Sequence, residues 1–304
     1  MKNNLAVKIG SLILKNPVLV ASGTFGYASE FEDFMDISAL GAVVTKTVTL
    51  VPRKGNVPPR TCETPAGMLN SIGLENPGIE VFVQEKILLA GKYNVPIIVS
   101  IASEGGFEEF TALTKRLDSV IEAAGIELNI SCPNVKSRGL VAQDPRSAYE
   151  AVKAARKGTG KTLIVKLSPN VTDITEIACA VQKAGADAVS LINTLYGMSI
   201  DTVTRKSRLG NIIGGLSGPA IKPVALKMVY DVSRSIKIPV IGMGGIISSS
   251  DAVEFLVAGA TAVSVGTGNF INPSVSLEII TGIERYLHEH AISSIRDLTG
   301  SLKI

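Results

Sequence analysis

Eight short runs rich in Val, Ile and Leu recur along the whole chain, and segments of helical period separate most of them. The helical segments at 145–158, 173–186 and 249–260 open with Pro, Asp or Ser and end at or near Gly, as helices often do. The eight runs are 17–23, 42–49, 95–102, 126–133, 162–169, 187–194, 239–245 and 262–268. Eight strand and helix units in about 250 residues are typical of a closed parallel barrel, so the pattern predicts the α/β class and a (β/α)8 TIM barrel.

An open doubly wound sheet is the structural alternative. That fold usually opens its first helix with GxGxxG, and no such motif follows the first run. The pair VKIG and LILK, which precedes the first run, predicts a small N-terminal hairpin that closes the N-terminal end of the barrel. The connections 50–78 and 195–218 are far longer than the others, and we expect them to be long loops at the C-terminal face, where barrel enzymes build their sites.

Length and composition describe a globular protein with a large core. The chain has 304 residues, 46% of them hydrophobic, and a net charge of only +3, which does not favour nucleic-acid binding. No linker divides it, so we expect a single domain over 1–304. No apolar run approaches the ~20 residues that span a bilayer, and the N-terminus lacks the features of a secretory signal. We therefore expect a cytoplasmic protein without membrane association.

Polar residues interrupt the C-terminal halves of five runs: Ser22, Lys46, Asn129, Lys166 and Asn193. Four of them share parity with an apolar residue two positions earlier and could project into the barrel mouth, whereas Asn129 shares parity with Glu127 and Ser131, so its run would turn a polar face inward. Two lysines at one mouth indicate an anionic ligand, or structural ion pairs with strand carboxylates. Apart from Asp187, which opens its run at the far end, Glu127 is the one carboxylate inside the runs. It could pair with Lys166 on the next strand, but not well with both lysines.

Glycine-rich turns close the last two runs, in GMGGI at 242–246 and SVGTGN at 264–269. Ordinary strand-to-helix turns also use Gly, but barrels commonly bind phosphate after these two strands, through backbone N–H groups. With Gly214, Gly215 and Gly218 in the long connection before them, the pattern predicts a phosphate-bearing ligand or cofactor on this side of the mouth.

Three cysteines, Cys62, Cys132 and Cys179, lie far apart, so neither a disulfide framework nor a metal site is indicated, and any iron-sulfur chemistry must come from another chain. Cys132 follows the fourth run, between Asn129 and Asn134. It is either an inert buried thiol or a base beside amides that hold a planar polar ring, because a thiol pKa near 8.5 lies close to neutrality. We expect Cys179 to be inert, and His288 and His290 to lie on a solvated helix end.

The combination of NISCPN, GMLNSIGLENPG, TKTVT, VKLSPN, LINT, GGLSGPAIKP, GMGGI and VGTG resembles the class 1 dihydroorotate dehydrogenases across essentially the whole chain. The forms RKGNVPPRTCETPAGMLNSIGL and GGLSGPAIKPVALKMV are most similar to the 1B catalytic subunit. This resemblance implies an FMN-dependent oxidation of dihydroorotate to orotate in pyrimidine biosynthesis.

The resemblance also implies site residues. The expected FMN contacts are Ala21, Ser22, Lys46, Thr47, Asn129, Lys166, Ile192, Gly218, Gly244, Gly245, Gly266 and Thr267. The expected substrate contacts are Lys46, Asn70, Ser71, Ile72, Gly73, Leu74, Asn129, Asn134, Asn193 and Thr194. Cys132 is implied as the base that removes the C5 proton while C6 passes a hydride to FMN N5. Ser100 stands where related enzymes often place Asn, so no role is assigned to it.

The 1B resemblance further implies a partner subunit that carries FAD and a 2Fe-2S cluster and passes electrons to NAD, in a heterotetramer of two catalytic and two electron-transfer chains. Three alternatives stay open at this point. A 1A-like homodimer would pass electrons to fumarate, a Schiff-base lyase or aldolase would use a strand-end lysine as nucleophile, and a binding or scaffold barrel would hold no flavin.

Overall fold

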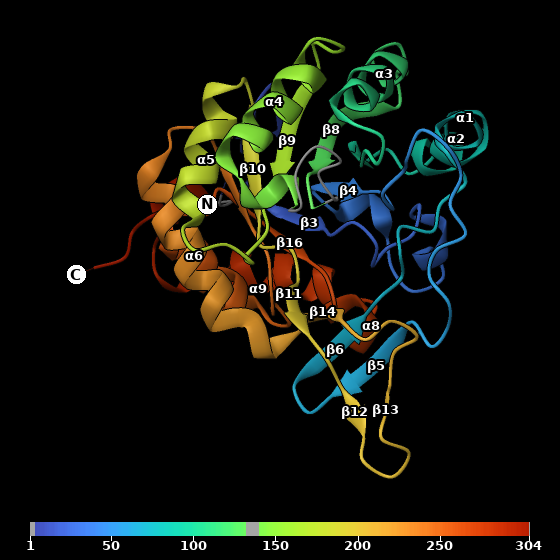
Figure 1. Ribbon diagram of the computed structural model, residues 1–304. Helices are drawn as coiled ribbons and strands as arrows, with labels where there is room; N and C mark the ends of the chain where they lie inside the picture. The colour runs from blue at the N-terminus through green and yellow to red at the C-terminus, as the bar shows by residue number, and fades with distance from the viewer. Residues whose placement is uncertain (1–3, 132–139, 304) are drawn as a thin grey trace.

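The structure is a computed structural model that describes residues 4–131 and 140–303. Eight parallel strands close a barrel in the order β10-β15-β16-β3-β4-β7-β8-β9 (Figure 1). Every strand position is apolar or otherwise buried except near the strand ends, because each strand lies between the barrel interior and a covering helix. The strands are β3 (Val18–Val20), β4 (Ala42–Val44), β7 (Ile97–Ile101), β8 (Ala123–Asn129), β9 (Thr162–Lys166), β10 (Ala188–Leu191), β15 (Val240–Gly242) and β16 (Ala262–Val265). All eight predicted strands are confirmed, and so is the closed barrel.

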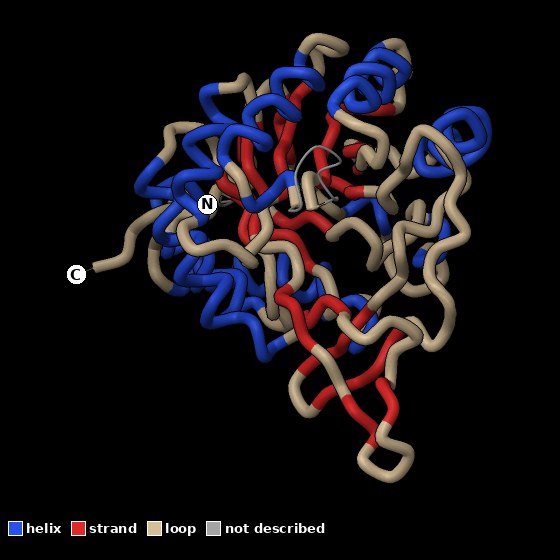
Figure 2. The backbone as a smooth tube through the Cα atoms, in the orientation of Figure 1, coloured by secondary structure: helices blue, strands red, loops and turns tan. Residues whose placement is uncertain are grey.

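Helices cover the outside of the barrel (Figure 2). Side chains at their first turns explain where several begin: Asp144, Asp173 and Ser248 each accept a hydrogen bond from a backbone N–H of the helix that follows. The connection after β3 forms only the short 3-10 turns η1 (Ser29–Phe31) and η2 (Ile37–Ala39) in place of a full helix. The main covering helices are α1 (Ile79–Val81), which continues through a π-helical turn, η3 (Phe82–Lys86), into α2 (Ile87–Gly91), then α3 (Phe107–Asp118), α4 (Pro145–Arg156), α5 (Ile174–Lys183), α6 (Lys222–Ser235), α7 (Ser249–Ala258) and α9 (Val275–Glu289).

The predicted N-terminal hairpin is confirmed. Strands β1 (Val7–Ile9) and β2 (Leu12–Leu14) pair antiparallel, with Ile9 and Leu14 fully buried. At the turn between them, the Ser11 N–H donates to Thr162 Oγ1 at 3.0 Å, at the first residue of β9. The hairpin therefore closes the N-terminal end of the barrel and leaves the opposite end open for a ligand.

The two long connections are not simply loops, which corrects the expectation from the sequence. Their strands form one antiparallel sheet in the order β11-β14-β6-β5 beside the barrel mouth (Figure 1). The bounds are β5 (Thr61–Thr64), β6 (Gly67–Asn70), β11 (Leu195–Gly197) and β14 (Gly214–Ser217), and a further hairpin of β12 (Ile200–Asp201) and β13 (Lys206–Ser207) projects beyond it. Sequences such as TCET and GGLS lack the apolar runs that predicted the barrel strands, so periodicity did not reveal them.

Within the described residues, no helix combines the length and hydropathy that a membrane crossing requires.

Candidate active site

A cavity of about 1050 Å³ opens at the C-terminal end of the barrel strands, between the barrel and the four-stranded sheet. Every site residue expected from the sequence that lies in the described chain lines this cavity. These residues are Ala21, Ser22, Lys46, Thr47, Asn70, Ser71, Ile72, Gly73, Leu74, Asn129, Lys166, Ile192, Asn193, Thr194, Gly218, Gly244, Gly245, Gly266 and Thr267. Cys132 and Asn134 lie outside the described residues. The topology thus brings together segments that are distant in the sequence, although their individual roles stay predictions.

The two lysines form the positive part of the cavity wall. Lys166 is the last residue of β9 and is only 7% exposed, and Lys46 follows β4 and is half-buried. Burial lowers the pKa of the Lys46 ammonium; the negative charge of Glu75 raises it, and the positive charge of Lys166 lowers it again. Among the described residues, no carboxylate forms an ion pair with either lysine. Largely buried cations that form no ion pair favour an anionic ligand.

Glu127 does not pair with Lys166, so the structural ion pair considered from the sequence is not present. Its Oε2 accepts a hydrogen bond from Ser190 Oγ at 2.8 Å, and its Oε1 has no partner in the described chain. The side chain is 1% exposed. Glu127 and Ser190 lie on β8 and β10, on either side of β9, so the two side chains meet inside the barrel. The lysines at the mouth remain free for a ligand.

Amides and hydroxyls gather beside the lysines. Asn129, the last residue of β8, pairs in register with Lys166 of β9. Asn193 Nδ2 donates to Ser131 Oγ at 2.9 Å and lies 3.4 Å from Asn129 Oδ1, while Asn193 Oδ1 accepts from the Thr194 N–H at 2.9 Å. These contacts fix the orientation of the amides, which offer both donors and acceptors to a planar polar ring.

The segment 70–74 forms another part of the wall and is held in place through its backbone carbonyls. Asn56 donates to the carbonyls of Ser71, through Nδ2, and of Ile72, through N–H, both at 3.0 Å. Arg53 Nε donates to the Gly73 carbonyl at 3.1 Å. Ser71 lines the cavity, but its hydroxyl is buried and has no partner in the described chain.

The glycine turns after β15 and β16 form the opposite side of the cavity. Gly244 and Gly245 adopt φ values of 125° and 78°, which favour glycine. Within the described chain, the backbone N–H groups of Gly244, Gly245, Gly266 and Thr267 donate to no other protein group. A Cβ added at Gly266 would lie beside the cavity-lining Ala21 and Thr24, no closer than 3.8 Å to either. The turn is therefore open toward the cavity and offers free donors to an anionic group.

Hydroxyl groups link the floor of the cavity to the barrel interior. Thr47 Oγ1 lies 3.1 Å from Ser22 Oγ and 2.9 Å from Ser100 Oγ. Ser22 and Thr47 line the cavity, whereas Ser100 is fully buried behind them. Ser100 therefore contacts the site through Thr47.

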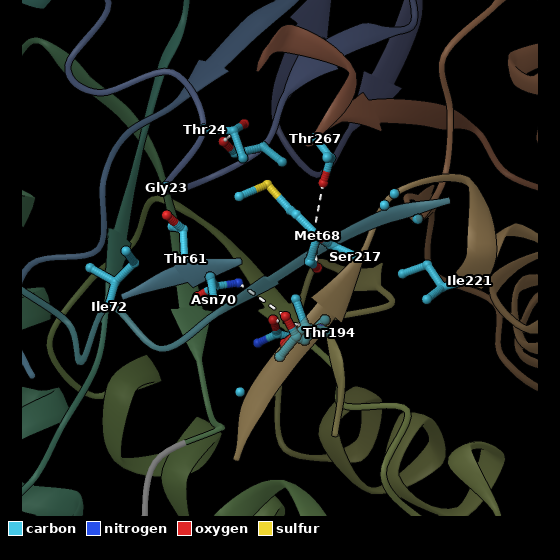
Figure 3. A pocket seen from close by; sticks show the side chains of 18 of the residues that line it. Gly23, Thr24, Thr61, Met68, Asn70, Ile72, Thr194, Ser217, Ile221 and Thr267 are labelled. Carbon is cyan, nitrogen blue, oxygen red and sulfur yellow. Dashed lines mark hydrogen bonds between the residues drawn. The ribbon is translucent and has the colours of Figure 1, made fainter. Parts of the chain in front are cut away.

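Several lining residues were not expected as site residues from the sequence, although Met68 and Ser217 lie within the quoted motifs GMLNSIGLENPG and GGLSGPAIKP. Met68 extends from β6 toward Thr24, and the Thr267 hydroxyl donates to Ser217 Oγ of β14 at 2.8 Å (Figure 3). Asn70 Nδ2 approaches the Gly215 carbonyl at 3.4 Å, in the pairing of β6 with β14 (Figure 3). Tyr196 and Phe270 also line the cavity. Only the pairing of the two long connections, which the sequence did not reveal, places Met68, Tyr196 and Ser217 here.

The remaining candidates lie away from the cavity. His288 and His290 are exposed at the end of α9, as expected. Cys179 packs partly buried on α5, with its Sγ 3.6 Å from the Ser235 carbonyl. No group of metal-ligating side chains occurs in residues 4–131 and 140–303. The cavity is thus the part of the described structure suited to chemistry: it presents two cations, several amides and a turn with free N–H donors.

Comparison with known proteins identifies relatives of the whole chain. A family model described as "Dihydroorotate dehydrogenase" matches residues 4–287. The protein named "Dihydroorotate dehydrogenase B (NAD(+)), catalytic subunit" from Pelobacter propionicus is 55% identical over 304 residues, which is all of both chains. Proteins of the same name from Trichlorobacter lovleyi and Geotalea uraniireducens are 54% identical over 306 residues and 52% identical over 302, covering 99% or more of each chain.

Proposed function

The chain belongs to the dihydroorotate dehydrogenase family, and from this membership we propose that it oxidises dihydroorotate to orotate as the catalytic subunit of an NAD-linked, class 1B enzyme. The observation that carries the proposal is the arrangement of the cavity. Two lysines that form no ion pair in the described chain and a group of oriented amides lie on one side, and a glycine turn with free N–H groups lies on the other. Dihydroorotate is a carboxylate-bearing ring with carbonyl and N–H groups, which matches the first side.

The residues present fit FMN. Its phosphate would be held by the free N–H groups at Gly244, Gly245, Gly266 and Thr267, where a Cβ at Gly266 would meet only Ala21 and Thr24. Its ring would lie against the barrel mouth, along Ala21, Ser22, Thr47, Lys166 and Ile192, with Gly218 nearby. When bound, FMN supplies the hydride acceptor that the protein side chains lack. The cavity volume of about 1050 Å³ slightly exceeds the ~300–1,000 Å³ typical of ligand sites, which suits a cofactor and a substrate together.

The chain's own residues would bind and orient the substrate. Lys46 and the segment 70–74 would hold its carboxylate and ring, and Asn129, Asn193 and Thr194 would pair with its carbonyl and N–H groups. Lys166 would supply positive charge at the cavity wall, where electrostatic stabilisation acts on developing negative charge. We further propose, from the sequence, that Cys132 removes the C5 proton and that Asn134 contacts the ring.

A second subunit would complete the reaction. The relatives' name, "catalytic subunit", supports a partner. We propose that this partner carries FAD and a 2Fe-2S cluster and passes electrons to NAD, in a heterotetramer of two chains of each kind. The cytoplasmic location expected from the sequence also stays a prediction.

An anaerobic titration tests the proposal. The purified chain is mixed with dihydroorotate while the visible flavin absorbance is followed. We expect bleaching by dihydroorotate in wild type, severe slowing in a Cys132→Ala variant that retains its flavin, and no effect of Cys179→Ala. A bound flavin that stays oxidised, both alone and with the partner present, would overturn the proposed activity. Turnover with fumarate by the isolated chain, at the rate seen with partner and NAD, would instead favour a 1A-like acceptor.

A further inference from the structure

Asn170 lies in the connection between β9 and α5, four residues after Lys166, and does not itself line the cavity. Its side-chain amide pairs with the backbone of the next barrel connection. Nδ2 donates to the Thr194 carbonyl and Oδ1 accepts from the Tyr196 N–H, both at 3.0 Å. A residue of a neighbouring strand would form the same two hydrogen bonds, accepting from one residue and donating to the residue two positions earlier, here Tyr196 and Thr194. The side chain thus takes the place of a strand at the free edge of β11.

Asn170 is itself held in place. Its N–H and its Nδ2 both lie 3.2 Å from Ser168 Oγ, and Ser168 is buried. The Asn170 carbonyl accepts from Gln143 Nε2 at 2.9 Å, at the start of the segment that leads into α4. An amide fixed at this many points loses little freedom when it pairs with the backbone, so it can determine where that backbone lies.

The backbone that Asn170 holds carries two expected substrate contacts. The Thr194 N–H donates to Asn193 Oδ1, and Asn193 Nδ2 donates to Ser131 Oγ. On the other side, Tyr196 pairs in register with Gly215 of β14, which pairs with Asn70 of β6. A shift of the backbone at Thr194 would therefore move the Asn193 amide. It would also move β11, the edge strand of the sheet to which Asn70 belongs.

We propose that Asn170 is a positioning residue that fixes the Asn193 and Thr194 side of the substrate site through its side-chain amide. The proposal rests on the proposed function, because Asn193 and Thr194 are taken to contact dihydroorotate. Asn170 would not touch the ligand in this role, and only an uncharged amide can fill the role. A carboxylate would repel the Thr194 carbonyl, and a methyl group would leave two backbone groups unpaired.

Anaerobic rapid mixing of the flavin-loaded protein with dihydroorotate measures the dissociation constant and the limiting rate of flavin reduction. We expect Asn170→Ala and Asn170→Asp to bind dihydroorotate roughly 10-fold more weakly, the effect of one good hydrogen bond, with the flavin content of wild type. A protonated Asp carboxyl can donate to the Thr194 carbonyl. The affinity of Asn170→Asp should therefore approach that of wild type as the pH is lowered, whereas the affinity of Asn170→Ala relative to wild type should not change.

Asp173→Ala is the matched control, because it removes a hydrogen-bonded side chain from the same connection and costs only the N-cap of α5. We expect it to lower stability and leave the dissociation constant unchanged. Hydrogen exchange at residues 194–196, followed by mass spectrometry without ligand, should be faster in the Asn170 variants and unchanged in Asp173→Ala.

Wild-type affinity or wild-type exchange in Asn170→Ala would overturn the role of Asn170 while wild type still bleaches. An affinity loss in Asp173→Ala as large as in Asn170→Ala would do the same. A wild-type flavin that dihydroorotate fails to bleach would overturn the proposed function itself, whereas the exchange measurement still reports whether Asn170 anchors the backbone.

Discussion

Ser190 Oγ donates a hydrogen bond to Glu127 Oε2 at 2.8 Å, inside the barrel and across the intervening strand β9. Both side chains are at most 1% exposed, and the other carboxylate oxygen has no partner in the described chain. This hydroxyl is therefore the main protein group that compensates a buried acidic side chain. The consequence is that Ser190 contributes to stability and not to the chemistry at the mouth.

We expect Ser190→Ala to lower the free energy of unfolding by about 1–3 kcal/mol, because it leaves a buried acceptor without its donor. Chemical denaturation of flavin-loaded protein measures the change. Ser264→Ala is the matched control, because Ser264 is an equally buried strand serine whose hydroxyl has no partner in the described structure. Ser264→Ala should hardly change the free energy of unfolding. Equal losses in the two variants would contradict the assignment.

Lys46 makes the affinity for an anionic ligand depend on pH. In the proposed function the charged ammonium of Lys46 binds the carboxylate of orotate, and burial together with Lys166 holds the pKa of Lys46 below 10.5 despite the opposing effect of Glu75. Affinity should therefore fall as the pH rises through this lowered pKa, before an exposed lysine would titrate. Lys46→Gln should weaken orotate binding roughly 10- to 100-fold at neutral pH, the range of a charged hydrogen bond, and remove the alkaline fall.

Calorimetric or spectral titration with orotate at several pH values measures both effects. The exposed Lys157 provides the control, and Lys157→Gln should reproduce the wild-type curve. An alkaline fall that persists in Lys46→Gln would assign the titration to another group.

The carboxylate of Asp251 supports the first glycine turn. It accepts from Lys222 Nζ at 2.6 Å, from the Ile247 N–H at 3.0 Å and from Ser248 Oγ at 2.8 Å. Burial raises the pKa of Asp251, but these hydrogen bonds and the charge of Lys222 outweigh it, and the pKa lies below the ordinary 3.8. Asp251→Asn should cost about 1–2 kcal/mol at pH 7 and weaken FMN retention.

The sign of the pH dependence follows from the lowered pKa. A carboxyl group with a depressed folded pKa contributes stability above its unfolded pKa and loses it as the pH falls through the folded value. The difference between wild type and Asp251→Asn should therefore be complete at neutral pH and shrink below about pH 4. Asp231→Asn, which removes the i,i+4 pair with the exposed Lys227, should change neither stability nor FMN retention. A pH-independent difference at Asp251 would contradict this account.

The barrel was predictable from the sequence because its strands are buried on both faces and therefore appear as continuous apolar runs. The sheet beside the mouth was not, because its strands are short and Gly67–Asn70 is stabilised by pairing with Gly214–Ser217, a segment about 150 residues away. Such long-range register leaves no periodic signal within either segment.

The site was predictable in part for a related reason. Lys46, Lys166 and Asn129 are polar residues that interrupt apolar runs, so the sequence alone indicated them as candidate site residues. Asn170 and Ser217 occupy ordinary turn or sheet positions, and only the three-dimensional contacts give them roles. The sequence left the partner of Glu127 open: Lys166, one strand away, was considered as a possible partner, whereas the structure shows Ser190, two strands away.

Gly266 provides the sharpest test of where the cofactor phosphate lies. Its φ is not in the left-handed region, and a Cβ placed there would meet only Ala21 and Thr24, at 3.8 Å or more. Gly266→Ala should therefore fold with the stability of the flavin-free wild type, within about 0.5 kcal/mol. Gly244→Ala would not isolate the effect. Residue 244 has a φ of 125°, which strains any residue other than glycine, and an added Cβ would lie 2.8 Å from Ala225.

The same Cβ would occupy the open side of the turn, next to the free N–H groups of Gly266 and Thr267. We expect FMN to bind Gly266→Ala at least about 10-fold more weakly, equal to about 1.4 kcal/mol, measured by fluorescence during titration of the flavin-free protein. Gly160→Ala is the control, because Gly160 also has open space around its missing side chain but precedes β9 at the opposite end of the barrel. Wild-type FMN affinity in Gly266→Ala would place the phosphate elsewhere, whereas a loss in Gly160→Ala as well would mean that the method reports general destabilisation.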